Sequence, residues 1–372
     1  MKKLFFIAAI AGAALVSCTK NEVAQSVNEQ QEIRFASPIV GATTKASTTP
    51  QYGLLTGTYP TGVSFGVWGW YNDTEDTNFP YMTDVEVKWN AADHSSTDPQ
   101  TGAWDPIKPY YWPKNGTLTF DAYSPFDIQG ANGCKVSCNP TSGLSIAGYV
   151  VPNTGLTETT TNKQIDVLYS TRTAPQNSSA GTTGDAYEGV DIVFNHALAA
   201  VAFTVKAADT YPAGTIRVES IVVNAFSKGD FAQNLNANPA KAPSWTANTS
   251  ADYTVLSKGT YTDAQELTTT EATAGVTALM MPQLFSESKA TVTVNYYIKN
   301  NDEDPLPQTA VFNLNDAVNQ AGTEGKTAVT VSQWEMGKIY TYNLTIGLQG
   351  IYFAPTIDNW DNVSVDLPTI NN

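Results

Sequence analysis

Short runs in which apolar and polar residues alternate recur along the chain, and turn-forming residues separate them. Residues 290–298 give the clearest case, with Val292, Val294, Tyr296 and Ile298 at a period of two. Successive side chains of a strand point to opposite faces, so this period predicts a strand with one buried face. The other candidate strands are 31–40, 62–71, 84–89, 116–123, 166–169, 190–196, 197–206, 215–223, 276–281, 310–314, 339–346, 351–353 and 362–367.

The spacing of these runs predicts an all-β fold of Greek-key sandwiches or barrels, since no window of 12 residues free of Gly or Pro has a convincing helical period. The length of 372 residues favours two domains. The stretch 207–214 is rich in small and turn-forming residues and is the best boundary. We therefore expect an N-terminal β-sandwich domain over 31–208 and a C-terminal one over 209–372.

Composition agrees with a folded two-domain protein, and the charge excludes one class of partner. Hydrophobic residues make up 42% of the chain, enough for a sizeable core, whereas charged residues make up only 15%, against about 25% in an average domain. The net charge is −15, and the 20 basic residues form no block that could neutralise phosphates. The charge pattern therefore argues against a nucleic-acid partner.

The first residues have the layout of a secretory signal. Lys2 and Lys3 precede a short apolar run that ends in Leu15-Val-Ser-Cys18, which resembles the lipobox of bacterial lipoproteins. We expect residues 1–17 to be the signal peptide, Cys18 the acylated anchor, and 18–30 a polar tether. The alternative is an ordinary signal peptide with a chance cysteine. In the lipoprotein reading, acyl chains are the only membrane attachment, because no later run is long enough to span a bilayer.

Two further cysteines, Cys134 and Cys138, leave a disulfide open, because an exported protein meets oxidising conditions. Cα atoms four apart in a straight strand are about 13 Å from each other, so the bridge requires a tight turn. A zinc site would need more soft ligands than the chain offers, since His94 and His196 are its only histidines. We expect no metal and no cofactor.

The sequence contains no arrangement that is typical of an active site. His196 lies in an apolar strand segment, and His94 lies in a loop without a Gly-x-Ser-x-Gly nucleophile motif. A pair of carboxylates as in glycoside hydrolases stays open among the 35 acidic residues, but none of them stands in a setting that predicts a raised pKa. We expect no catalysis.

Several segments, taken together, resemble the fimbrillin family, the subunits of type V pili of Gram-negative bacteria. The matching pieces are the lipobox, 32–35, 65–70, 111–125, 166–169, 193–205, 337–344 and Trp360. Their order and their spread over nearly the whole chain carry the resemblance. It implies two tandem transthyretin-like β-sandwich domains and a structural or adhesive fimbrial subunit at the outer membrane and cell surface.

The resemblance also implies a mechanism of assembly. Precursors of the family travel as lipoproteins, and an Arg- or Lys-specific protease then cuts after the first strand. A strand of a neighbouring pilus subunit fills the groove by β-strand addition. In this chain the first strand would be 32–40 and the cut would fall between Lys45 and Ala46. Arg34 is the other basic candidate, but a residue within a strand should be less accessible than one in a loop.

Two alternatives stay open at this stage. Residues 362–370 carry Val363, Val365 and Leu367 at a period of two, as a donated strand needs, but they could instead complete the sandwich of their own chain. The protein could also be a non-polymerising surface lipoprotein that binds host or bacterial glycans or matrix proteins. Trp68 and Trp70 would then stack on sugars, whereas the ordinary interpretation of these rings is core packing.

Overall fold

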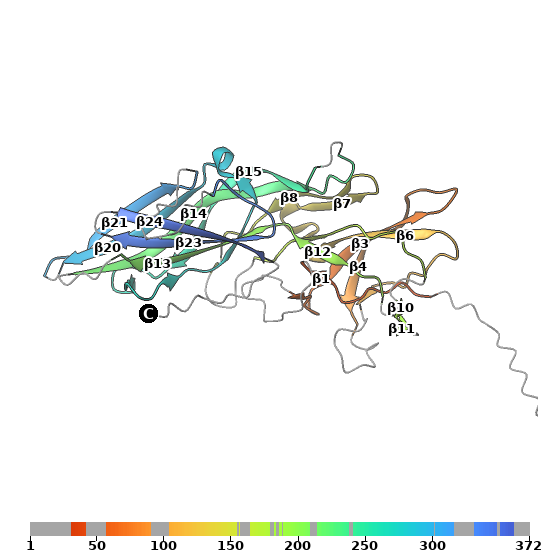
Figure 1. Cartoon of the computed structure of the whole chain (residues 1–372), viewed down its shortest axis with the longest axis horizontal. Coiled ribbons are helices and arrows are strands. Elements are labelled where there is room, and N and C mark those ends of the chain that lie inside the picture. Colours follow the sequence, from red (N-terminus) through yellow and green to blue (C-terminus); the bar gives the residue numbers. More distant parts are fainter. Residues whose placement is uncertain are drawn as a thin grey trace, which may run out of the picture.

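The all-β class is confirmed by the computed structural model. The structure describes residues 31–41, 57–90, 104–154, 156, 164–178, 182–183, 186–187, 189–208, 214–237, 241–300, 302–315, 331–347 and 350–360. Within these residues the helical elements are α1 (Phe285–Ser288), η2 (Phe126–Ile128) and η3 (Ala131–Gly133). Among the same residues no helix is long and apolar enough to cross a bilayer. Figure 1 shows an elongated molecule whose two ends are built from different sheets.

One end of the molecule is an eight-stranded sheet. Its order is β2 (Gly57–Thr58), β1 (Ile39–Val40), β12 (Val193–His196), β9 (Leu168–Ser170), β6 (Thr117–Ser124), β3 (Phe65–Asn72), β4 (Phe79–Trp89) and β5 (Trp104–Pro106). The sheet curls back on itself, because residues just before β1 form bridges with both of its distant parts. Phe35 bridges Trp104 of β5 on one side and Val190, just before β12, on the other. The first described residues therefore close a ring of strands.

The other end holds two larger sheets. The seven-stranded sheet contains β21 (Leu306–Asn313), β20 (Thr291–Asn300), β14 (Gly214–Ala232), β8 (Gly143–Val150) and β7 (Lys135–Asn139), with β15 (Ser244–Ser257) and β16 (Gln265–Glu266) also paired to β14. The five-stranded sheet contains β17 (Thr273–Ala274), β13 (Ala199–Ala207), β23 (Lys338–Gly347) and β24 (Gly350–Asn359), with β18 (Ala278–Met280) paired to β13. Side chains of both sheets share one buried cluster, as in a β-sandwich.

Two short antiparallel pairs complete the described strands. They are β10 (Thr182–Thr183) with β11 (Ala186–Tyr187), and β19 (Gln283–Leu284) with β22 (Gln333–Trp334).

The buried side chains form two hydrophobic cores, and β3 contributes to both. Phe65 and Val67 belong to the core of the eight-stranded ring, whereas Trp68 and Trp70 belong to the core of the sandwich. This division follows from the alternation of side chains along a strand. The expected strand over 62–71 is thus present as β3, and both of its faces are buried.

Strands with a weak apolar period escaped the sequence analysis. β7, β8 and β15 were not expected, and β14 runs for 19 residues where only 215–223 was expected. Most of β15 is exposed and carries Thr, Ser, Asn and Ala, because only part of one face packs on the core. The division of the chain at residue 208 stays a prediction. Strands from both sides of that residue share sheets, since β8 pairs with β14 and β13 with β23.

Candidate functional site

The candidate site is the slot that residues 31–41 occupy in the ring; we call these residues the N-terminal strand. One wall of the slot is β5 with residues 110–112. The other wall is the stretch 190–194, which includes the first two residues of β12. The N-terminal strand runs antiparallel to the first wall and parallel to the second. Backbone hydrogen bonds join it to both walls.

The first wall binds the leading half of the N-terminal strand. The N–H of Ile33 donates to the carbonyl of Tyr110 at 2.7 Å, and the N–H of Phe35 donates to that of Trp104 at 2.9 Å. The carbonyl of Gln31 accepts from the N–H of Trp112 at 2.9 Å. Each bond satisfies a backbone group that would otherwise be left unpaired at the edge of β5 or the residues after it.

The second wall binds the strand along more of its length. The N–H groups of Ala36, Ile39 and Gly41 donate to the carbonyls of Val190, Ile192 and Phe194 at 2.9, 3.0 and 2.9 Å. Val190 in turn donates its N–H to the carbonyl of Arg34 at 2.8 Å. Beyond Ala36 the strand leaves β5, and Ile39 and Val40 pair with β2 instead.

The side chains of the N-terminal strand fill the core of the ring. Ile33 and Phe35 are 1% and 0% exposed, and the Phe35 ring packs edge-on against Phe65 and Phe120 with centroids 5.9 and 5.5 Å apart. Pro38 and Val40 are also buried. Burial of a phenylalanine contributes about 1.5–3 kcal/mol, so the strand is held by its side chains as well as its backbone.

Taking the N-terminal strand out of the slot would leave two unpaired sheet edges and an empty apolar pocket. Such an arrangement binds an extended peptide, because the edges supply backbone hydrogen bonds and the pockets select alternate side chains. The chemistry available to the site is therefore strand addition.

Gly189 allows the N-terminal strand to approach its wall closely. This residue has φ of 94°, and a Cβ at this position would lie 2.6 Å from the carbonyl carbon of Phe35 and 2.7 Å from the nitrogen of Ala36. Only glycine tolerates both conditions. The sequence analysis missed Gly189. Its position directly before the apolar run 190–196 is the one sequence signal that could have pointed to it.

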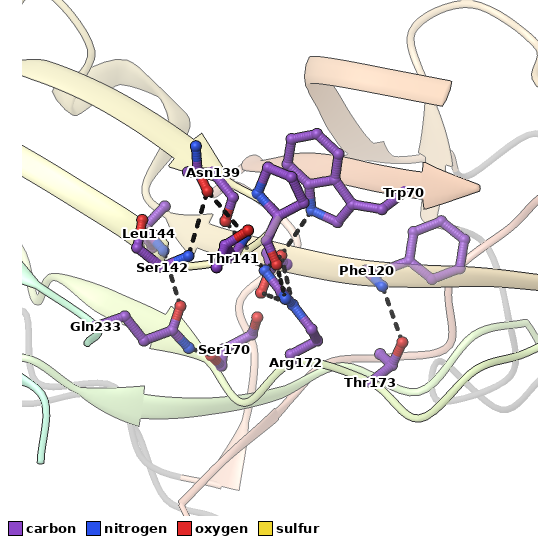
Figure 2. A network of polar contacts seen from close by, with 12 residues as sticks. Trp70, Phe120, Asn139, Thr141, Ser142, Leu144, Ser170, Arg172, Thr173 and Gln233 are labelled. Carbon is purple, nitrogen blue, oxygen red and sulfur yellow. Dashed lines mark hydrogen bonds and ion pairs between the residues drawn. The ribbon is translucent and has the colours of Figure 1, made fainter. Parts of the chain in front are cut away.

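A buried ion pair holds the ring against the sandwich (Figure 2). Asp121 of β6 is 1% exposed, and Arg172, just after β9, donates to it from Nε and Nη2 at 3.0 and 2.7 Å. The indole N–H of Trp70 donates to the same carboxylate at 2.8 Å. Arg172 also donates to the carbonyls of Asn139 and Pro140 in the turn between β7 and β8.

Neutral groups extend this network to β14. Gln233 donates from Nε2 to the carbonyl of Ser170 at 2.8 Å and accepts from the N–H of Leu144 at 2.9 Å. The Ser170 hydroxyl accepts from the N–H of Ala122 at 2.7 Å. Because β9 pairs with β12, these bonds support one wall of the slot from its outer side. That wall is held by contacts that do not involve the N-terminal strand.

A second buried cluster lies where β12 ends. Nδ1 of His196 lies 2.6 Å from Oδ2 of Asp166, and the Trp360 ring stacks on the imidazole with centroids 3.9 Å apart. The N–H of Trp360 donates to the carbonyl of Gly337, whose own N–H donates to the carbonyl of Leu198. The last described residue of the chain is therefore anchored beyond the end of the slot wall.

The structure changes the interpretation of two pairs of candidate residues. Trp68 and Trp70 are 4% and 5% exposed, so they pack in the core and do not present a ring face to a sugar. Cys134 and Cys138 are both free, since β7 begins directly after Cys134 and keeps the two apart along an extended strand. Burial raises the pKa of Cys134 to about 11 and, with the nearby Asp121 carboxylate, also raises the pKa of Cys138.

Of the residues at which a protease is expected to cut, only Arg34 lies within the described part of the chain. Arg34 lies in the N-terminal strand with its carbonyl bonded to Val190, and its guanidinium lies 3.6 Å from Asp105 and 3.7 Å from Glu32. A protease needs an extended, free backbone, so this position is protected. Cys18, Lys45 and Ala46 lie outside the described residues, as do His94 and residues 362–370.

A cavity of about 700 Å³ opens on the sandwich, and Tyr169 of β9 is the one residue of the ring among its lining residues. Its walls include the half-buried rings of Tyr169, Phe226 and Trp245 and the exposed carboxylates of Glu287 and Glu335. No lysine or arginine is among its lining residues. Nowhere in the described part of the chain do three His, Cys, Asp or Glu side chains gather as metal ligands.

Comparison with known proteins identifies a family that matches this chain. The sequence profile of a fimbrillin-like family matches residues 44–360. A fimbrial protein from Bacteroides vulgatus is 16% identical with a TM-score of 0.52, covering 88% of this chain and 99% of its own. A candidate cell adhesion protein from Bacteroides uniformis is 12% identical with a TM-score of 0.48, covering 90% and 100%. No curated protein matches the chain. At this identity, the likeness to the fimbrial protein shows a shared fold.

Replacement of Gly189 tests the close contact at the slot wall. Gly189→Ala should destabilise the protein by about 2 kcal/mol or more, because the new Cβ meets the backbone of residues 34–36 at a positive φ. Hydrogen exchange should accelerate in 31–41 ahead of the sandwich strands. Gly62→Ala is the control, since a Cβ there meets nothing within 4 Å. Unchanged exchange in 31–41 would contradict the close contact.

Removal of the buried cation tests the junction. Arg172→Ala leaves the Asp121 carboxylate buried without its counter-charge and should cost about 3 kcal/mol in urea unfolding. Lys88→Ala removes a cation from an exposed pair with Glu86 and should cost less than about 1 kcal/mol. Equal effects of the two substitutions would show that the Asp121 pair is no more than a surface contact.

Proposed function

This chain belongs to the fimbrillin-like family, and we propose that it is a structural and adhesive subunit of a type V pilus that polymerises by exchanging its first strand. The family places it among structural proteins of a cell-surface appendage, not among enzymes. The observation that carries the proposal is the closure of the ring by the N-terminal strand. That strand pairs with two walls, and the proposed cut after Lys45 falls between it and β2, the next strand of the ring along the chain.

Activation in this proposal is one hydrolysis. The precursor is exported as a lipoprotein on Cys18 and reaches the outer membrane through its acyl chains. Cleavage between Lys45 and Ala46 severs both the anchor and the N-terminal strand from the remaining chain. The severed strand is then held only by non-covalent contacts and can leave, so the subunit is released and its slot becomes available in the same step.

The slot suits the exchange of one strand for another because one of its walls is supported independently of the N-terminal strand. The wall that contains β12 is supported through β9 by Arg172 and Gln233, so it keeps its place when the strand leaves. A strand from another subunit then meets edges already positioned for hydrogen bonding, which lowers the ordering cost of binding. The partners implied are other pilus subunits.

The processing step is testable on protein sheared from cells that express it. Intact mass and N-terminal sequencing should find a chain that begins at Ala46, without acyl groups, in a ladder of heat-resistant oligomers. Lys45→Gln should retain its earlier N-terminus and remain monomeric, since the N-terminal strand stays covalently attached.

Arg34→Gln provides the matched control, because it removes the other basic candidate while leaving Lys45 in place. It should be processed and assembled like the unaltered protein. Surface oligomers that all retain acylated Cys18 would contradict activation by cleavage and would favour a non-polymerising lipoprotein or an anchor subunit.

A second candidate function is glycan binding by an adhesin, and the cavity lined by Tyr169 and Trp245 favours it. Half-buried aromatic rings can stack on the apolar face of a sugar, and carboxylate and amide groups can bind its hydroxyls. The absence of Lys and Arg from the lining disfavours anionic ligands, so neutral glycans are the expected class. This assigns the role to Trp245 and Tyr169 in place of Trp68 and Trp70, which are buried.

Binding of neutral oligosaccharides to the full chain tests this second function. Trp245→Phe should weaken binding about tenfold, equivalent to about 1.4 kcal/mol, because the smaller ring offers less stacking surface. The control is Trp89→Phe, a half-buried tryptophan outside the cavity. Thermal unfolding of both variants separates lost binding from lost fold. Equal glycan affinity of Trp245→Phe and the unaltered protein would remove the cavity from consideration.

A further inference from the structure

The strand β21 is an edge of the seven-stranded sheet, at the end of the molecule far from the slot (Figure 1). It pairs only with β20, and Asn313 lies opposite Thr291. In the same register, the N–H of Leu314 donates to the carbonyl of Ala290 at 2.8 Å. Backbone groups of an antiparallel strand point alternately to its two sides. The even-numbered residues of β21 therefore bond to β20, and the odd-numbered ones point to the free side.

Pro307 agrees with this assignment, because its missing N–H then falls on the free side and costs the sheet no hydrogen bond. The next two odd-numbered residues are Thr309 and Val311. Each presents one N–H and one carbonyl to the free side, and no described strand pairs with them there. The edge of β21 thus offers two donors and two acceptors.

Other edges of the sandwich are covered by glutamine side chains. On β7, the Gln129 amide accepts from the N–H of Val136 and donates to its carbonyl, both at 2.9 Å. On β18, the Gln164 amide does the same for Leu279, at 2.7 and 2.9 Å. An amide bound in this way occupies the groups that an added strand would need.

The edge of β24 is interrupted by a proline. The N–H of Trp360 donates to the carbonyl of Gly337 in the register that joins β24 to β23, so odd-numbered residues of β24 point to the free side. Pro355 is one of them and lies in the middle of the strand. Because it has no N–H, it breaks the row of donors that strand addition requires.

The edge of β21 has neither kind of protection. Beyond Pro307 it contains no proline, and the whole strand Leu306–Asn313 contains no charged residue. Val311 is 63% exposed, more than any other large hydrophobic side chain in the described residues. Uncharged, exposed strand edges pair readily with other strands.

We infer that β21 is a lateral contact surface whose partner is β21 of a second copy, paired antiparallel about a two-fold axis at Ala310. This rotation places Thr309 of each copy opposite Val311 of the other. The two donors and two acceptors of one edge then meet those of the second, which gives four hydrogen bonds. A second copy is the partner because the edge is complementary to itself.

The register follows from which residues have free backbone groups. An axis at Thr309 would place Val311 opposite Pro307, which has no N–H to donate. An axis at Val311 would place Thr309 opposite Asn313, the last residue of the strand. The axis at Ala310 pairs the two available residues with each other.

Charge does not oppose this contact, although the chain carries a net charge of −15. The nearest acidic group is the exposed run Asp302, Glu303 and Asp304, directly before β21. Asp304 is six residues from the axis, so in the antiparallel pair the two runs lie about 40 Å apart. That separation is several times the Debye length of about 8 Å at physiological salt.

The contact is weak in isolation, because stable interfaces bury about 1,200–2,000 Å² and a five-residue edge offers less. It therefore dissociates on heating and does not contribute to heat-resistant oligomers. Copies that are held close together pair more often, since their effective concentration is high. If the proposed function holds, the contact repeats along neighbouring fibres and joins them side by side.

Disulfide trapping on intact cells tests the pairing in full-length Lys45→Gln protein, whose N-terminal strand stays attached. Ala310 would face its own copy in a non-hydrogen-bonded pair, with Cα atoms about 4.5 Å apart. Ala310→Cys should therefore form a disulfide-linked dimer under a mild oxidant. Gln308→Cys is the matched control on the same face, because its two copies would lie about 13 Å apart.

The Ala310→Cys dimer should exceed the Gln308→Cys dimer at least tenfold. It should also exceed, by the same factor, the background from Lys45→Gln protein with its native cysteines alone. Addition of Val311→Lys to Ala310→Cys places two like charges at the contact and should lower the dimer yield at least tenfold. Thr254→Lys, at an exposed position of β15 in the same sheet, should leave the yield unchanged. Thermal unfolding of both lysine variants separates lost pairing from lost fold.

Yields that do not differ between Ala310→Cys and Gln308→Cys would overturn the inference. A yield from Ala310→Cys that Val311→Lys leaves unchanged would overturn it as well. Either result leaves the proposed function standing, because Lys45→Gln protein takes no part in strand exchange. Conversely, failure of the cleavable protein to form heat-resistant oligomers would contradict the proposed function, and a trapped Ala310→Cys dimer would still support this pairing.

Discussion

The structure depends on the pairing of backbone groups along two edges of one curled sheet. β5 and the stretch 190–194 lie on either side of the N-terminal strand, and both carry N–H and carbonyl groups that need partners within a folded protein. Residues 31–41 supply those partners and place Ile33 and Phe35 in the core between them. The N-terminal strand therefore completes both the backbone pairing and the hydrophobic core of the ring.

The rest of the fold supports that ring from the outside. β3 has no solvent-facing side, because its alternate side chains enter the ring core and the sandwich core. The Asp121–Arg172 pair and Gln233 connect β6 and β9 to β14 and to the turn between β7 and β8 (Figure 2). Buried polar contacts therefore join the ring to the sandwich, in addition to the packing of β3.

The sequence predicted most strands because one buried face produces a period of two. The run 290–298 was predicted correctly for this reason, whereas 62–71 was predicted correctly although both of its faces are buried. β15 was missed because only part of one face is buried, and β7 and β8 were missed because turn residues interrupt their pattern. Gly189 and Arg172 carry no periodic signal, since their roles depend on which distant backbone or carboxylate lies beside them.

By itself, the sequence determined the all-β class, the apolar N-terminal strand and the resemblance to fimbrillins, because these depend on local patterns. Only the tertiary structure decided that Trp68 and Trp70 are buried and that Cys134 and Cys138 are free. It also decided that the buried positions of the N-terminal strand are Ile33, Phe35, Pro38 and Val40, which depart from a period of two after Phe35. Burial and register are relations between strands far apart in the chain, so no local pattern contains them.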